Sequence, residues 1–130
     1  MSKAFGVLAL LACLASTSAM AGQEKGHWSK VADAVVAEVD KAEALAKDGK
    51  ADDAKEAAIN AYFGVFEELK MEIAERQTLG AKHVAEIEAL FNDLRKASGK
   101  SRDLKAQADP LRKMLKADGK GLDAAGVEVP

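Results

Sequence analysis

Residues 52–76 constrain the fold most, because their apolar side chains recur with the period of an α-helix. At about 100° per residue, one face of such a helix carries Ile59, Tyr62, Phe66, Leu69 and Ile73. Asp53 and Glu56 have the spacing of a capping box at its start. We therefore predict one long amphipathic helix over 52–76, with Glu67 at one edge of its apolar face and Glu72 at the other.

Three further segments have the same helical pattern. We predict a first helix over 29–47, ended by Gly49 as its left-handed C′ residue, and a third helix over 81–98. Apolar residues at helical spacing define the fourth: Leu104, Ala108, Leu111 and Leu115. Pro110 lies within it and leaves two interpretations open. The helix can run on with a kink, which the unbroken apolar stripe favours, or a new helix can begin with Pro110 at its first position.

Four amphipathic segments joined by short connections predict an all-α fold, an antiparallel up-down four-helix bundle over residues 22–118. A chain of this length can bury one core, so we expect a single domain. We place five residues at the centre of that core: Tyr62, Phe66, Ile87, Phe91 and Leu94. Residues 119–130 contain three glycines and few large apolar side chains, so we predict a flexible C-terminal tail there.

Residues 1–21 are typical of an export signal peptide. Lys3 precedes an apolar run over 5–15 that is too short to span a bilayer, and residues 19–21 (Ala-Met-Ala) have the small-x-small form of a cleavage site. We expect cleavage after this site and a periplasmic protein. The alternative is a lipoprotein signal, in which Cys13 would carry the lipid.

The composition excludes several classes of function. The only cysteine lies in the predicted signal peptide, so the mature chain has no disulfide, thiolate metal site or C-x-x-C-H haem attachment. The formal net charge is −2 and the basic residues do not cluster, which argues against nucleic-acid binding. The chain has neither a phosphate-binding glycine motif nor a nucleophile beside a base, so we expect no enzyme.

Acidic residues on the predicted second helix are candidate metal ligands. Glu68, Glu72 and Glu75 follow one another at i+4 and i+3, and a bound cation would relieve their repulsion. Each can equally be a solvated surface charge. Met71, one turn from Glu67, can supply a soft sulfur ligand or can simply fill a gap in the core.

The third predicted helix carries a second candidate set. His83 and Glu86 are at i, i+3, a metal-binding geometry of helical bundles, and this pair resembles the H-x-x-E element of imelysin-type proteins. The alternative is that His83 is a partly buried, hydrogen-bonded residue near the start of the helix. The other histidine, His27, lies in the polar segment before the first helix and is a weaker candidate.

Two segments, AYFGVFEELKME (61–72) and EIEALFNDLRKA (86–97), resemble the extracytoplasmic helical module that precedes the membrane part of many bacterial high-affinity iron permeases. In that module A-Y-F-x-x-F-E, with a Met-Glu shortly after, is followed by a helix with I-E-x-x-F-x-x-L-R. The matching positions are Ala61, Tyr62, Phe63, Phe66, Glu67, Met71, Glu72, Ile87, Glu88, Phe91, Leu94 and Arg95. The resemblance covers residues 49–97. It implies metal ligands at Glu67, Met71, Glu72 and Glu88.

The chain lacks the membrane helices and R-E-x-x-E motifs of a permease, so the resemblance implies the module alone. The expected function is the binding of an iron or copper ion in the periplasm, assisting a membrane iron permease or another metal-uptake component. One alternative is a haem-binding electron-transfer bundle resembling the periplasmic b-type cytochromes, although no histidine stands at that family's ligand position. Another is a ligand-free helical interaction or stress protein. The sequence leaves open whether the protein forms a homodimer.

Overall fold

A computed structural model describes residues 23–130, and all of the regular secondary structure in this range is helical. The elements are α1 (His27–Lys47), α2 (Ala51–Asn60), the π-helix η1 (Ala61–Glu67), α3 (Met71–Leu79), α4 (Ala81–Ser98) and α5 (Lys105–Ala124). The predicted all-α class is therefore confirmed for this range. The predicted signal peptide and the lipidation alternative at Cys13 lie outside the described residues.

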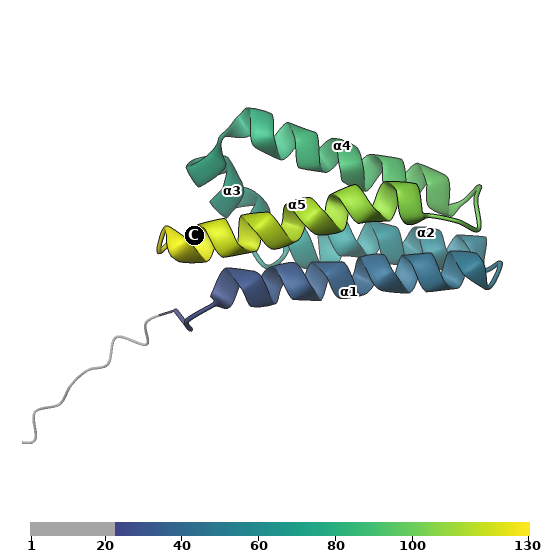
Figure 1. The fold of residues 1–130 in the computed structure, drawn as a ribbon, viewed down its shortest axis with the longest axis horizontal. Helices are drawn as coiled ribbons and strands as arrows, with labels where there is room; N and C mark the ends of the chain where they lie inside the picture. The colour runs from purple at the N-terminus through teal and green to yellow at the C-terminus, as the bar shows by residue number, and fades with distance from the viewer. Residues whose placement is uncertain (1–22) are drawn as a thin grey trace, which may run out of the picture.

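The long helices lie side by side and successive ones run in opposite directions (Figure 1). Helix α1 packs mainly on α5 and α2, while α4 packs on α2 and α5. The short helix α3 lies at one end of the molecule, where it contacts α4, η1 and α5. The fold therefore brings three helices, α3, α4 and α5, together at that end.

The single long helix predicted over 52–76 is wrong. Helix α2 passes into the π-helix η1, and Lys70 then adopts a left-handed conformation (φ 67°) before α3 begins in a new direction. The apolar face is displaced as a result, because a π-helix adds residues to a turn. Ile59, Leu69 and Ile73 are 36–42% exposed, and small residues of α2 with Phe66, Met71 and Ala74 are buried instead.

The predicted core is confirmed in its larger part. Phe66, Ile87 and Leu94 are fully buried and Phe91 is 4% exposed. Tyr62 is only half-buried, with its ring centroid 5.2 Å from that of Phe91. The apolar residues predicted for the fourth helix are all buried: Leu104, Ala108, Leu111 and Leu115. Pro110 lies inside α5, which confirms the interpretation as one continuous helix.

The flexible tail predicted from Gly119 is wrong for residues 119–124, which continue α5. Gly119 is buried at a close approach between two helices: a Cβ atom there would lie 2.9 Å from the Ala32 Cβ and from the Trp28 carbonyl oxygen. Leu122, three residues later, is fully buried. The boundary expected at residue 118 therefore falls within a packed helix, because the small residues of α1 and α5 allow close contact.

The end of α5 also caps the start of α1. Asp123 accepts hydrogen bonds from the backbone N–H groups of Trp28 (2.8 Å) and Ser29 (2.9 Å). These are two of the N–H groups that a helix N-terminus leaves without an intrahelical partner. Burial acts to raise the pKa of Asp123, but the hydrogen bonds from Ser29 and Trp28 outweigh it and lower that pKa. The Trp28 indole N–H donates to the carbonyl oxygen of Val127, so the chain after α5 is tied to α1 as well.

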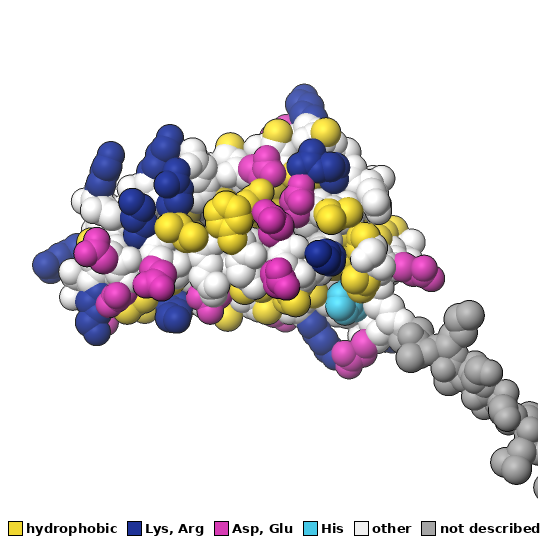
Figure 2. Space-filling view, turned by 180° about the vertical axis from the view of Figure 1, so that it is seen from behind, with side chains coloured by type: hydrophobic (Ala, Val, Ile, Leu, Met, Phe, Trp, Pro, Cys, Tyr) yellow, Lys and Arg dark blue, Asp and Glu magenta, His cyan; other side chains and the backbone are white. Residues whose placement is uncertain are grey.

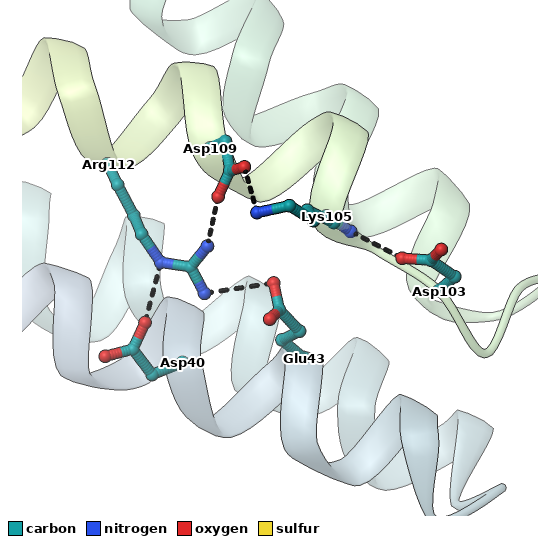
Figure 3. Close-up of polar contacts among 6 residues, drawn as sticks. All are labelled: Asp40, Glu43, Asp103, Lys105, Asp109 and Arg112. Carbon is teal, nitrogen blue, oxygen red and sulfur yellow. Dashed lines mark hydrogen bonds and ion pairs between the residues drawn. The ribbon is translucent and has the colours of Figure 1, made fainter.

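Near its other end, α5 is joined to α1 by an ion-pair cluster around Arg112 (Figure 3). The guanidinium donates to Asp40 (2.7 Å) and Glu43 (3.0 Å) of α1 and to Asp109 (2.9 Å) of its own helix. Lys105 donates to Asp109 at 2.7 Å. Each carboxylate in this cluster therefore has a cationic partner within the chain.

Candidate functional site

Glu75 of α3, His83 of α4 and Asp118 of α5 meet at the end of the molecule where α3 lies. One carboxylate or imidazole atom from each lies within 4.8 Å of those of the other two. Glu75 is fully buried, Asp118 is 7% exposed, and the side chain of His83 is 27% exposed. Within residues 23–130, this is the only group of three or more His, Asp or Glu side chains that comes together in this way.

The backbone around α3 brings these residues together. The left-handed turn at Lys70 starts α3 in a new direction, and Gly80 then joins α3 directly to α4. Gly80 has φ 93° and ψ 161°, a conformation that glycine adopts far more readily than other residues. The two helices contact each other, so Glu75 reaches His83 across a short connection. Asp118 approaches from α5, one residue before the close contact of Gly119 with α1.

The hydrogen bonds of the cluster leave Glu75 without a donor. His83 Nε2 and Asp118 Oδ2 are 2.7 Å apart and share a hydrogen bond. No group among residues 23–130 donates a hydrogen bond to either carboxyl oxygen of Glu75, although both are buried. Burial, then the negative charge of Asp118 and a hydrogen bond shared with that carboxylate, raise the pKa of Glu75 to about 9. At neutral pH this carboxyl group keeps its proton unless a cation takes the place of that proton.

The donor set suits a first-row transition metal. One imidazole nitrogen and two carboxylate groups converge from three helices, which is how helical proteins build such sites. Ligand atoms bound to one ion at 2.0–2.2 Å lie about 3 to 4 Å from one another, close to the spacing of this cluster. The 2.7 Å contact of His83 with Asp118 must widen slightly, and its shared proton must leave. Small side-chain movements therefore separate the present geometry from a coordinating one.

The second predicted candidate set is divided by the structure. His83 lies in the cluster. Its hydrogen bond to Asp118 also agrees with the alternative that His83 is a partly buried, hydrogen-bonded residue near the start of the helix. Glu86, its predicted partner one turn along α4, is exposed and outside the cluster. In the sequence, Glu75 stands out only as one of three repelling glutamates, and Asp118 is not among the predicted ligands. Asp118 does have a sequence signal, because it is a polar residue within an apolar stripe and stands between Leu115 and Leu122 at helical spacing.

The ligands implied by the iron-permease resemblance are dispersed. Glu67 is exposed and Met71 is fully buried. Glu72 and Glu88 do face each other from α3 and α4, but Arg76 lies between them. It is hydrogen-bonded to Glu72 and its Nη2 is 3.7 Å from Glu88 Oε1. A role for these carboxylates in metal binding stays a prediction, with less support because Arg76 already supplies a positive charge.

Tyr62 completes this second network. Its hydroxyl group donates a hydrogen bond to Glu88 Oε1 at 3.0 Å. Burial and then this bond raise the pKa of Tyr62, so the phenol stays protonated. Tyr62 and Arg76 thus hold Glu88 from two sides, and the arrangement of these residues is explained without a ligand.

Comparisons with known proteins assign no family. No family model, curated protein or solved structure matches this chain. Among residues 23–130, no helix has both the length and the apolar character needed to span a membrane.

Proposed function

We propose that this protein binds a divalent transition-metal ion through Glu75, His83 and Asp118. The observation that carries the proposal is the environment of Glu75: it is fully buried, its two carboxyl oxygens accept no hydrogen bond, and a histidine and a second carboxylate lie beside it. Burying a polar group without a partner is costly, and buried carboxylates are normally paired or bound to a metal. A cation here would balance Glu75 and Asp118 together.

Iron is the first candidate for the ion because the resemblance over 61–72 and 86–97 implies iron uptake. Imidazole and carboxylate ligands suit Fe²⁺, Zn²⁺ and Cu²⁺, whereas Cu⁺ prefers thioether or thiolate sulfur, which Glu75, His83 and Asp118 do not provide. Three protein ligands leave positions on the ion for water or for a ligand from another protein. Such a site is suited to holding a metal and passing it on, and we propose no catalytic reaction.

The wider role follows from the sequence. We propose that residues 1–21 direct export to the periplasm and that the long helices form the antiparallel four-helix bundle, with α3 inserted at one end. The partner would be a membrane iron permease or another metal-uptake component, as the resemblance over 61–72 and 86–97 implies. The haem alternative has less support because His83 Nε2, which would face the haem iron, is hydrogen-bonded to Asp118.

Metal titration of the metal-free protein tests the proposal. Binding to the folded form alone stabilises it by about 2.7 kcal/mol at a hundredfold excess of free ion over Kd. We expect the melting temperature to rise with Fe²⁺ added without oxygen, and with Zn²⁺ as a redox-stable probe. Calorimetry should give one ion per chain.

Two substitutions and one control locate the site. Glu75→Gln keeps the shape of the protonated side chain and should abolish the metal-dependent rise, as should His83→Gln. Glu86→Gln removes an exposed carboxylate of α4 outside the cluster and should leave the rise unchanged. The proposal is wrong if wild-type protein shows no rise with either ion, or if Glu75→Gln retains it in full.

A further inference from the structure

A groove of about 400 Å³ lies between α4 and the segment formed by α2 and η1. Tyr62, Phe63 and Ile59 form one wall, and Phe91, Glu88 and Arg95 contribute the other from α4. Hydrophobic side chains are exposed across the middle of the back face of the molecule (Figure 2). The metal-site residues Glu75, His83 and Asp118 do not line this groove, so an inference about it is independent of the proposed metal binding.

The groove has an apolar ridge beside it. Phe63 is 59% exposed and Ile59 is 36% exposed, and both belong to the wall of the groove. The ring of Phe63 lies 4.8 Å from that of Tyr62, with the two rings nearly perpendicular. Phe63 lies in η1, and π-helical turns often occur at functional sites. Exposed apolar patches of this kind mark interaction surfaces.

The two ends of the groove carry side chains of opposite charge, although Glu88 is also held within the chain by Tyr62 (3.0 Å) and Arg76 (3.7 Å). Glu88 and Arg95 lie on either side of Phe91 on α4 and are separated by about 10 Å along the helix axis. Arg95 donates a hydrogen bond to Asn92 and makes no ion pair within residues 23–130. In Figure 2, basic side chains gather on one side of the exposed hydrophobic patch and acidic side chains lie directly on its other side.

We propose that a second copy of this chain docks on this groove, related to the first by a two-fold axis near Phe91. A two-fold axis makes an interface from the same patch on both copies. It would place the Phe63 ridge of each copy in the groove of the other, and Arg95 of each copy opposite Glu88 of the other. A ridge beside a groove, with a base at one end and an acid at the other, is self-complementary under this symmetry. This self-complementarity selects a second copy over an unrelated protein.

Sedimentation velocity of the purified protein over a concentration series tests the interface. We expect a monomer–dimer equilibrium. Phe63→Glu should raise the dissociation constant at least about tenfold, because an exposed aromatic anchor becomes a buried charge at the interface. Leu79→Glu is the matched control: Leu79 is 39% exposed on α3, away from the groove, and its substitution should leave the equilibrium unchanged. Circular dichroism checks that each variant keeps its helical content.

A charge exchange tests the predicted symmetry. Arg95→Glu alone and Glu88→Arg alone should each weaken dimerisation, because like charges then face each other twice. An equimolar mixture of these two variants should restore it, because every cross-copy pair is again of opposite sign. The proposal is overturned if the protein stays monomeric up to about 1 mM, if the dimer survives Phe63→Glu, or if the mixed variants associate no better than each alone.

Discussion

The cluster around Arg112 and the cluster around Glu75 both gather carboxylates from different helices, yet they differ in how the negative charge is balanced. Arg112 lies between Asp40, Glu43 and Asp109 and donates a hydrogen bond to each of them. No lysine or arginine ion pair reaches Glu75 within the described part of the chain, and no group donates a hydrogen bond to its carboxyl oxygens.

The number of acidic residues is therefore a poor guide to a metal site. The useful criterion is whether the chain itself already supplies the counter-charge. By that criterion the carboxylates of Glu72 and Glu88 resemble the Arg112 cluster, since Arg76 lies between them. Glu75 and Asp118 are buried together without such a cation, which is why the proposed metal binding is assigned to them.

The largest expected effect is on the pH dependence of the metal-free protein. The pKa of Glu75 is about 9 in the folded protein, against an ordinary value of 4.5. Between these values the folded protein binds more protons than the unfolded chain, so its stability falls as pH rises. The slope should be on the order of 1 kcal/mol per pH unit, measured as the free energy of unfolding in urea.

Glu75→Gln isolates this contribution, because the amide does not titrate and the slope should largely disappear. The stability that the Arg112 cluster contributes should depend on pH in the opposite direction. Lys105 and then Arg112 lower the pKa of Asp109, so its contribution is present above the ordinary pKa of the carboxyl group and is lost as the solution becomes more acidic. A metal-free wild type whose stability does not fall between neutral and alkaline pH would contradict the predicted environment of Glu75.

The next effect tests the packing that holds the two clusters in place. Gly119→Ala should destabilise the protein by about 1–3 kcal/mol, because the new methyl group meets the Trp28 backbone carbonyl oxygen and the Ala32 methyl group. Gly121→Ala is the matched control on the same helix. Nothing lies within 4 Å of its added Cβ, so helix propensity should make it stabilising by up to about 1 kcal/mol. Equal effects of the two substitutions in thermal denaturation would show that α5 does not approach α1 closely here.

The smallest expected effect on stability comes from substitutions in the Arg112 cluster. Arg112→Met keeps most of the aliphatic length but leaves Asp40, Glu43 and Asp109 without their shared cation, so we expect a loss of about 1–2 kcal/mol. Lys105→Met removes only the exposed outer pair and should have a smaller effect than Arg112→Met, because solvent screens exposed pairs. Denaturation in low and in high salt checks that both losses are electrostatic, since screening should reduce each of them. If Arg112→Met proves neutral, these ion pairs do not join α1 to α5.

Some predictions from the sequence were confirmed because they depend on local pattern alone. The third predicted helix, 81–98, coincides with α4, and the first differs from α1 only at its start. Their apolar stripes are continuous and are ended by glycine or polar residues, so the sequence determines both the helices and their buried faces. His83 was found for the same reason: an imidazole next to an apolar stripe can be recognised in the sequence.

Other features depend on contacts between residues far apart in the chain. Lys70 takes a left-handed turn within a segment whose composition favours an unbroken helix, and packing of η1 and α3 against the rest of the molecule accompanies that turn. Residues 119–124 are helical although glycine-rich, because Gly119 fits against α1 and Asp123 caps it.

The helical content of residues 23–130 and the buried faces of α1, α4 and α5 can therefore be read from local sequence pattern. The inward turn of Glu75 toward Asp118 depends instead on packing between distant segments, because the environment of a carboxyl group is set by all the elements around it. His83 and Asp118 are 35 residues apart in the chain, and Glu75 reaches them only because α3 leaves the line of α2. Periodicity along one helix carries no information on which residues of three separate helices come into contact.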